Sequence, residues 1–233
     1  MLPLSILAGG FASRLGSLTE NLPKCLIEVN GRHFVDWQIE LLSKHGYSDY
    51  VFCVSHKSEM VQKHLGDGSR LGVNIKYSFD GDRQLGTAGA IRKALPLLGD
   101  RFGVVYGDSY LPISYSTVEA GFLNSGKDAL MTVYENKDSL GANNTEYSNG
   151  QILNHDKIES RPDMKHIDYG LSYFSAKAFS KLKPDEYFDL SHLVKQLLEK
   201  RQIIGFEVFT RFYEIGSESG IQDFSDYLRK VEK

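Results

Sequence analysis

The sequence contains little cysteine, and its cysteines form no recognisable metal site. Its 233 residues include only Cys25 and Cys53, which have neither CxxC spacing nor a histidine cluster beside them. Zinc motifs need such clusters, so a zinc site is not expected. Isolated cysteines of this kind are typical of small apolar core residues in a reducing compartment.

Long hydrophobic runs and a strong excess of one charge are also missing. No apolar stretch approaches the roughly 20 residues that a membrane helix needs. The apolar start, residues 1–7, has no basic region and is interrupted by Gly9 and Gly10, so we interpret it as a buried strand and not as a signal peptide. With a net charge of −3, neither nucleic acid nor a membrane is an expected partner. We expect a cytoplasmic protein that binds phosphate through a few local groups.

The composition that remains is that of an ordinary globular protein. Hydrophobic residues make up 41% of the chain and charged residues 24%, as in typical soluble domains. One α/β domain can reach about 250 residues, and no repeat, low-complexity stretch or linker divides this chain. We therefore predict a single domain over 1–233.

The first half of the chain alternates between strand and helix patterns. Apolar residues recur at helical spacing in 34–44, and short apolar or alternating runs lie on either side. The predicted strands are 4–8, 50–54, 73–77 and 102–106, and the predicted helices are 34–44, 59–65 and 87–98. This order favours a parallel, doubly wound sheet that binds ligands at the carboxyl ends of its strands.

The second half adds elements of another kind. The predicted strands are 129–134, 167–174 and 204–209, and the predicted helices are 176–182, 190–200 and 222–230. Asn149 and Gly150 lie between two polar, extended segments and indicate a hairpin. The predicted fold class is therefore α/β, a Rossmann-like doubly wound mixed sheet with antiparallel additions in the second half.

The segment LAGGFASRL, residues 7–15, is the most informative part of the chain. Gly9 and Gly10 follow the first strand, where exposed amide groups can hold phosphate. Arg14 can add a forked cation. The segment is neither a GxxxxGK[ST] loop nor a GxGxxG fingerprint. Taken alone, the two glycines favour a plain tight turn.

The tripeptide Leu22-Pro23-Lys24 changes that interpretation. Proline stiffens the approach to Lys24, whose ammonium can act on phosphate oxygens as a point charge. Together the two segments resemble the opening signature of the sugar-1-phosphate nucleotidyltransferases (NDP-sugar pyrophosphorylases), L-A-G-G-x-G-T-R-L followed by P-K. The chain is most similar to the short, single-domain members, such as the D-glycero-D-manno-heptose 1-phosphate guanylyltransferases. Ala12 and Ser13 depart from the family's glycine and threonine, and alanine adds a methyl group to the loop.

Residues 84–90, QLGTAGA, resemble the family's L-G-T-A-G-A segment, which lines the base and ribose. The resemblance implies that Gln84 and Gly89 face the nucleotide, and Thr87 is a candidate N-cap of the helix. A small-residue packing turn explains the segment equally well. The implied nucleotide-binding residues are Leu7, Ala8, Gly9, Gly10, Phe11, Ala12, Ser13, Arg14, Gln84, Gly89 and Asp108.

Two carboxylates match the Mg²⁺ ligands of the family. Asp108 follows the fourth predicted strand and resembles the aspartate of the family's G-D motif. Glu214, within FYEIGS, stands where the family's W-x-D-x-G motif has aspartate. The plainer interpretations are a turn-forming aspartate and a glutamate that caps the next helix. The resemblance implies Mg²⁺ as the cofactor, held by Asp108 and Glu214.

Polar residues of the second half are candidates for binding the sugar phosphate. Asp168 and Gly170 lie in IDYGL, which resembles the N-x-G segment that contacts sugar hydroxyls. Lys157 resembles the lysine of an E-K pair that reaches the sugar phosphate, and Asn143 precedes the hairpin. Ordinary polar loops explain these residues equally well. The resemblance implies a nucleotide-binding half near 1–112 and a sugar-binding half near 113–233.

The resemblance covers residues 2–233 and implies an enzyme of EC 2.7.7 type. Such an enzyme joins a nucleoside triphosphate to a sugar 1-phosphate and releases pyrophosphate, which supplies NDP-sugars for cell-surface polysaccharide. Arg14, Lys24 and Asp108 would be catalytic, because this transfer depends on positioning and charge neutralisation. GTP with a heptose 1-phosphate is the expected pair, while UTP and CTP stay open. The family often forms dimers, so a homodimer also stays open.

Three alternatives remain at this point. A glycosyltransferase with a similar sheet usually carries a D-x-D motif, whereas Ser109 and Tyr110 follow Asp108. A non-catalytic, nucleotide-binding regulatory homologue would fit the departures at Ala12 and Glu214. A transferase that acts on an alcohol or amine phosphate would share the same nucleotide half.

Overall fold

The first half of the chain folds as a parallel sheet in the computed structural model, which describes residues 1–10, 22–55, 57–137 and 140–231. The strands β1 (Leu4–Leu7), β4 (Asp49–Val54), β5 (Asn74–Phe79) and β6 (Arg101–Tyr106) lie in the order β6-β1-β4-β5, all parallel. The central strands β1, β4 and β6 are buried along almost their whole length. Near-continuous apolar runs are what a sheet covered on both faces requires.

The second half extends this sheet with mixed pairings. The strand β11 (His166–Ser175) lies antiparallel to β6 and to β8 (Ala129–Glu135), and β12 (Ile203–Val208) runs parallel to β8. The strands β9 (Thr145–Ser148) and β10 (Gln151–His155) form the predicted hairpin. Its turn residues Asn149 and Gly150 both have positive φ, 48° and 81°, as a type I′ turn requires. The predicted α/β mixed sheet is therefore confirmed.

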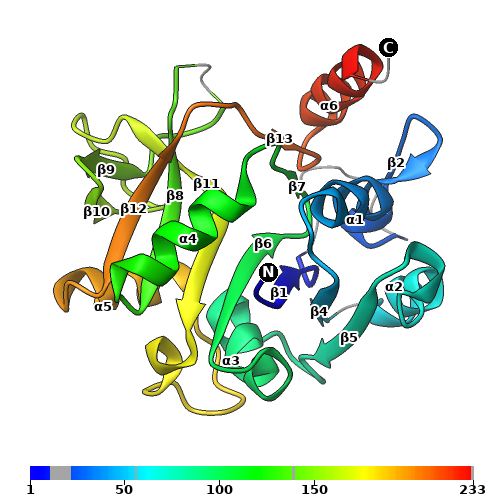
Figure 1. Ribbon diagram of the computed structural model, residues 1–233, viewed down its shortest axis with the longest axis horizontal. Helices are drawn as coiled ribbons and strands as arrows, with labels where there is room; N and C mark the ends of the chain where they lie inside the picture. The colour runs from blue at the N-terminus through cyan, green and yellow to red at the C-terminus, as the bar shows by residue number, and fades with distance from the viewer. Residues whose placement is uncertain (11–21, 56, 138–139, 232–233) are drawn as a thin grey trace.

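Helices cover both faces of the sheet (Figure 1). The helices are α1 (Phe34–Lys44), α2 (Ser58–Leu65), α3 (Gly86–Leu98), α4 (Tyr115–Ser125), α5 (Leu190–Glu199) and α6 (Glu218–Val231). Buried side chains of α1, α2 and α4 share one core with alternate residues of β4, and those of α3 and α5 share a second core on the other face. The alternation of β4 between the two cores follows from the two-residue period of a strand.

Two small antiparallel sheets of two strands each lie beside the main sheet. In one, β7 (Ser109–Tyr110) pairs with β13 (Tyr213–Glu214), and in the other β2 (Glu28–Val29) pairs with β3 (Arg32–His33). A third core joins these pieces to α6, and the rings of Tyr110 and Phe224 lie 4.7 Å apart at its centre. The end of the chain is thereby brought against the carboxyl end of β6.

The structure differs from the sequence prediction in two helices. Helix α4 was not predicted, because Gly121 and several β-branched or hydroxyl residues weaken its local helix signal. Its buried residues Tyr115, Val118 and Phe122 nevertheless follow helical spacing, and packing stabilises the helix. The α-helix predicted over 176–182 is instead a short 3₁₀ helix, η4 (Ala176–Phe179).

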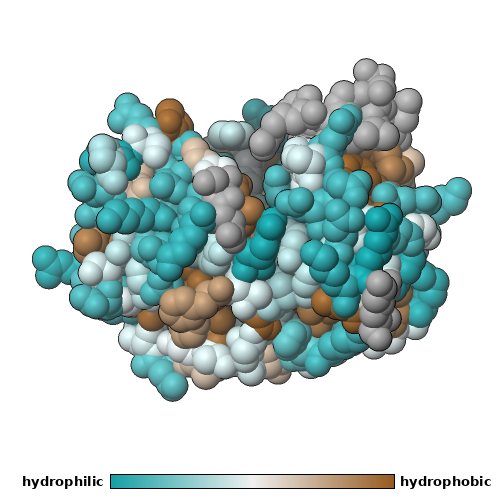
Figure 2. Space-filling view, turned by 90° about the horizontal axis from the view of Figure 1, so that it is seen from above, coloured by the Kyte–Doolittle hydropathy of each residue, from teal (hydrophilic) through white to brown (hydrophobic). Residues whose placement is uncertain are grey.

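The described surface agrees with the mixed charge of the sequence. Among the described residues, no helix combines the length and the apolar character needed to cross a bilayer. The face seen in Figure 2 carries mainly hydrophilic side chains, and its hydrophobic residues form small separate groups.

Candidate active site

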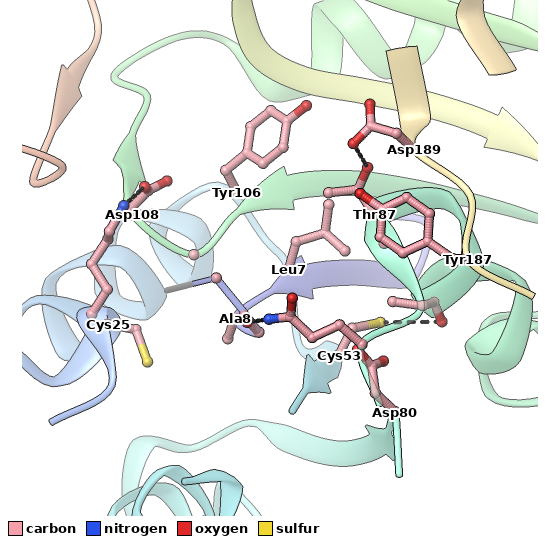
Figure 3. A pocket seen from close by; sticks show the side chains of 17 residues that line it. Leu7, Ala8, Cys25, Cys53, Asp80, Thr87, Tyr106, Asp108, Tyr187 and Asp189 are labelled. Carbon is pink, nitrogen blue, oxygen red and sulfur yellow. Dashed lines mark hydrogen bonds and ion pairs between the residues drawn. The ribbon is translucent and has the colours of Figure 1, made fainter. Parts of the chain in front are cut away.

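A pocket of about 280 Å³ opens at the carboxyl ends of β1 and β6. This is where a doubly wound sheet is expected to bind its ligand. Figure 3 shows Leu7 and Ala8 at its centre, with Asp108 on one side and Thr87, Tyr187 and Asp189 on the other. The described lining residues are Leu7, Ala8, Gly9, Gly10, Lys24, Cys25, Cys53, Asp80, Gln84, Gly86, Thr87, Ala90, Tyr106, Gly107, Asp108, Tyr187 and Asp189.

Lys24 and Asp108 form an ion pair in this pocket. The Nζ of Lys24 lies 2.8 Å from Oδ2 of Asp108, and the two side chains are 15% and 27% exposed. Lys24 begins the short 3₁₀ helix η2 (Lys24–Leu26), which is anchored by the buried side chains of Cys25 and Leu26. Two residues that are far apart in sequence, both predicted to be catalytic, are therefore neighbours at one wall.

The turn that carries Asp108 passes very close to β1. The amide of Gly107 donates to the carbonyl of Leu7 at 3.0 Å. A Cβ atom on Gly107 would lie 2.9 Å from that carbonyl oxygen and 3.1 Å from Cα of Ala8. Only glycine fits without a shift of the backbone, so Gly107 sets the distance between Asp108 and the glycine turn.

The glycine turn is tied to both neighbouring segments. The carbonyl of Gly9 accepts hydrogen bonds from Oγ of Ser55 at 2.8 Å and from Nε2 of Gln84 at 3.3 Å. Gln84 thus lies at the mouth of the pocket, next to the turn predicted to hold phosphate. Gly89 lies behind this wall, where a Cβ would come within 2.6 Å of the carbonyl of Glu186, so the packing interpretation accounts for this glycine.

Thr87 is not the N-cap of α3. Helix α3 begins at Gly86, and its N-cap position is held by Leu85 without a side-chain cap. The hydroxyl of Thr87 instead donates to Oδ2 of Asp189 at 3.1 Å and accepts from the amide of Leu190 at 2.7 Å. This long-range contact joins α3 to the start of α5 and could not be recognised from the local sequence.

Three of the four predicted sugar-phosphate residues, Lys157, Asp168 and Gly170, lie around Tyr106, which lines the pocket. The Nζ of Lys157 donates to the hydroxyl of Tyr106 at 2.9 Å and lies 3.4 Å from Oδ2 of Asp168. A Cβ atom on Gly170, whose φ is 104°, would lie 3.5 Å from the ring of Tyr106. Burial raises the pKa of Tyr106 to about 12, so its hydroxyl stays protonated at neutral pH.

Lys157 remains charged in this setting. Burial works to lower the pKa of the Lys157 ammonium, but Tyr106 and Asp168 beside it outweigh that effect and hold the pKa above its usual range. A cation between a tyrosine and a carboxylate is suited to an anionic ligand that carries hydroxyl groups. Asn143 is bonded within its own loop, where its Oδ1 accepts from Nδ2 of Asn136 at 2.8 Å.

A chain of hydrogen bonds through the buried residues His155 and Thr145 supports the position of Asp168. The hydroxyl of Thr145 donates to Oδ1 of Asn144 at 2.8 Å, and that oxygen also accepts from the amide of Asp168 at 2.9 Å. Nδ1 of His155 lies 2.9 Å from the same hydroxyl. Because the hydroxyl proton is used on Asn144, Nδ1 of His155 must carry the proton that it donates to Thr145.

The burial of His155 predicts a loss of stability at mildly acidic pH. His155 is 1% exposed, and burial lowers its pKa below the ordinary value of 6.5. Below pH 6.5 the unfolded chain therefore binds more protons than the folded one, so the free energy of unfolding decreases as the pH falls. Urea unfolding between pH 7.5 and 5.5 should show this decrease, and His155→Asn should show a smaller one. Equal pH dependence of the unfolding free energy in both proteins would show that His155 is not its cause.

Comparison with known proteins identifies the family. Residues 5–153 match the family model described as nucleotidyl transferase. The chain belongs to this family. The nucleotidyl transferase match, which covers the glycine turn, Lys24 and Asp108, favours the predicted class over the glycosyltransferase alternative.

Two curated nucleotidyl transferases illustrate the similarity. The chain is 28% identical over 196 residues to D-glycero-alpha-D-manno-heptose 1-phosphate guanylyltransferase of Campylobacter jejuni, covering 84% of this chain and 86% of that protein. It is also 28% identical over 207 residues to UTP–glucose-1-phosphate uridylyltransferase of Synechocystis, covering 79% of this chain but 52% of that protein. The chain thus spans only about half the length of the second relative.

The fold is also shared with solved nucleotidyl transferases. A Bacillus anthracis protein described as a glucose-1-phosphate thymidylyltransferase, solved in complex with sucrose, superimposes with a TM-score of 0.87. The match covers 98% of this chain and 96% of that one at 21% identity. At this identity, the likeness establishes the fold alone.

The expected metal ligands come from two segments of this nucleotidyl transferase that lie side by side. Glu214 pairs with Ser109 across β13 and β7, and the amide of Ile215 donates to the carbonyl of Asp108 at 3.1 Å. Among the described residues, no group of three or more His, Cys, Asp or Glu side chains is placed to hold a metal. Two carboxylates nevertheless fit Mg²⁺, which prefers oxygen ligands and is often held by one or two carboxylates together with substrate phosphates. Joint ligation by Asp108 and Glu214 stays a prediction.

Four of the predicted residues, Phe11, Ala12, Ser13 and Arg14, lie outside the described residues. In contrast, several residues that line the pocket were not predicted. Asp189 is one of them, and it accepts hydrogen bonds from Ser191 and Thr87. Its position before a helix is a recognisable N-cap signal, but its place in the pocket depends on the tertiary fold.

Proposed function

We propose that the protein transfers a nucleotidyl group from a nucleoside triphosphate to a sugar 1-phosphate and releases pyrophosphate. The observation that carries this proposal is the Lys24–Asp108 pair, 2.8 Å apart, beside the glycine turn at the end of β1. The pair supplies one cation for phosphate and one carboxylate for a metal, within a pocket that the family is expected to use for its nucleotide. Family membership and this geometry support the same reaction.

Residues near the glycine turn are expected to bind the phosphates of the nucleoside triphosphate. The amides of the glycine turn, together with Arg14, are expected to hold the phosphates that leave as pyrophosphate. Lys24 would steady the α-phosphate as negative charge builds up there. No general base is required, because the phosphate of the second substrate is already ionised at pH 7 and can attack directly.

The second substrate, the sugar 1-phosphate, is expected to bind near Tyr106. Lys157 would pair with the sugar phosphate, and Asp168 would accept hydrogen bonds from sugar hydroxyls. When bound, Mg²⁺ would neutralise phosphate charge and help to align the two phosphates. Asp108 and Glu214 would hold it through hard oxygen ligands.

GTP with a heptose 1-phosphate is the proposed substrate pair. The Campylobacter relative supports it, because this relative is matched over 86% of its own length and is named for that reaction. The Synechocystis relative is named for UTP and glucose 1-phosphate, which makes UTP the main alternative. CTP, an alcohol phosphate as acceptor, and a non-catalytic regulatory role are the remaining alternatives. The proposal includes a cytoplasmic location, a role in making cell-surface polysaccharide, and a homodimer that light scattering can test.

A substrate grid tests the proposed function. Purified protein is incubated with Mg²⁺, each of GTP, UTP, CTP, ATP and dTTP, and a panel of sugar 1-phosphates, and pyrophosphate release is followed. We expect one strong signal, with GTP and a heptose 1-phosphate, and its loss when Mg²⁺ is removed with a chelator. A strong signal with another pair would keep the reaction but replace the substrates. If no pair of substrates gives pyrophosphate, although a separate measurement shows that nucleotide binds, the regulatory alternative is favoured.

A further inference from the structure

Gln38 of α1 reaches from the protein core to the backbone of the turn that carries Asp108. Its Nε2 donates to the carbonyl of Tyr106 at 2.8 Å and to the carbonyl of Ser109 at 2.7 Å. Both distances are short for amide hydrogen bonds. Gln38 is 2% exposed, so its NH₂ group is shielded from water. One side chain therefore bridges the two residues that flank Gly107 and Asp108.

The orientation of this amide follows from its partners. Both acceptors are carbonyl oxygens, so only the NH₂ group of Gln38 can face them. Its Oε1 consequently points away, and within the described part of the chain this buried oxygen has no hydrogen-bond partner. Leaving a buried oxygen unpaired costs stability, so the arrangement sacrifices some stability to supply two donors to the turn.

The other backbone groups of the turn are held by separate elements. The amide of Gly107 donates to Leu7 in β1, and the carbonyl of Asp108 accepts from Ile215 beside β13. Gln38 adds the third anchor, from the helix α1. With the backbone fixed from three directions, the Asp108 carboxylate is left free to meet Lys24.

We propose that Gln38 is a positioning residue, which holds the Asp108 turn at the distance that the reaction requires. This inference rests on the proposed function, because it assigns Asp108 a part in phosphoryl chemistry. Groups that act in such reactions must be held within about 0.5 Å of their productive position. Without the two donors, the turn would keep its other anchors but would move more freely between Tyr106 and Ser109.

The test compares Gln38→Met with Tyr77→Phe. Methionine keeps the length of glutamine but has no donor. Tyr77→Phe removes a side-chain donor to another backbone carbonyl, that of Gly66 at 2.7 Å, and neither of these two residues lines the pocket. With the best substrate pair, we expect Gln38→Met to lower kcat at least about tenfold, or 1.4 kcal/mol, with little change in KM for the nucleotide. Tyr77→Phe should leave kcat unchanged. Equal losses in the two variants, or a wild-type kcat in Gln38→Met, would overturn the proposal.

Gln38→Glu distinguishes donation from shape. Glutamate has the shape of glutamine, but as a carboxylate it cannot donate to either carbonyl. Burial raises the pKa of such a carboxyl group, and its protonated form would restore one donor. We therefore expect kcat of Gln38→Glu, relative to the wild type, to rise as the pH falls from 8 to 6. A constant ratio across this range would contradict donation.

Amide hydrogen exchange separates this inference from the proposed function. Residues 106–110 should exchange faster in Gln38→Met than in the wild type and should be unchanged in Tyr77→Phe. This comparison needs no turnover, so it applies even if the substrate grid is silent. Unchanged exchange at the turn would overturn the anchor, and faster exchange with an unchanged kcat would overturn its part in the reaction.

Discussion

Asp108→Asn is expected to lower the rate of nucleotidyl transfer at least about a hundredfold, equivalent to about 2.7 kcal/mol in the barrier. Asparagine keeps the shape of aspartate but removes its negative charge. The side chain could no longer hold Mg²⁺ strongly, and Lys24 would lose its ion-pair partner. Losing one electrostatic stabiliser of a transition state typically costs this much.

The same change should disturb the fold much less. The Asp108 and Lys24 side chains are 27% and 15% exposed, and a partly exposed ion pair contributes about 1 kcal/mol or less. Thermal unfolding of the variant should therefore stay close to that of the wild type, so that a loss of rate reports on the site and not on unfolding. Pyrophosphate release at saturating substrate measures the first quantity and calorimetry the second.

Asp128→Asn is the matched control for this prediction. Oδ1 of Asp108 accepts from the hydroxyl of Ser109 at 3.4 Å. Asp128 likewise accepts from a serine hydroxyl, that of Ser175 at 3.1 Å, and lies 3.6 Å from Nζ of Lys177. Ser175 pairs with Arg101 at the first residue of β6, so this carboxylate lies at the opposite end of that strand. Its variant should keep the wild-type rate. A rate near the wild type in Asp108→Asn itself, with the fold intact, would remove Asp108 from the proposed reaction.

Most of the fold could be predicted because its signals are local. The apolar runs of β1, β4 and β6 and the helical spacing of α1 and α3 lie within windows of about 15 residues. Helix α4 was missed, because its stability comes from packing against the sheet rather than from its own sequence. The pairing of β7 with β13 could not be predicted either, because each strand has two residues and the partners are about 100 positions apart.

Residues of the candidate site could be predicted from the sequence only where they lie in a recognisable motif. Lys24 and Asp108 were found by resemblance, and the fold brings them together across 84 positions. The helical spacing around Gln38 indicates that its side chain is buried, because Gln38 lies four residues from both Phe34 and Leu42, which are buried. A polar residue in the middle of a buried helix face needs a partner. The identity of that partner, a turn about 70 residues further along the chain, is a property of the tertiary fold.

Lys24→Met is expected to reduce the rate by at least about a hundredfold, by the same electrostatic argument. The lysine stem is largely buried at 15% exposure, and methionine fills a similar volume without the charge. Lys44→Met is the matched control, because Lys44 is 71% exposed and pairs with Glu40 on its own helix. This control should keep the wild-type rate, since surface substitutions of this kind change little. A similar rate in both variants would exclude Lys24 from the reaction.

The double variant Lys24→Met/Asp108→Asn then decides whether the pair acts as one unit. If Lys24 and the Mg²⁺ that Asp108 would hold stabilise charge on the same phosphate, removing the second residue adds little once the first is gone, as for other groups that act together. We expect the double variant to fall no more than about tenfold below the slower single variant. If instead the two effects multiply to about ten-thousandfold, each residue acts on its own group. Lys24 would then act on the α-phosphate, and the Mg²⁺ held by Asp108 on a different phosphate.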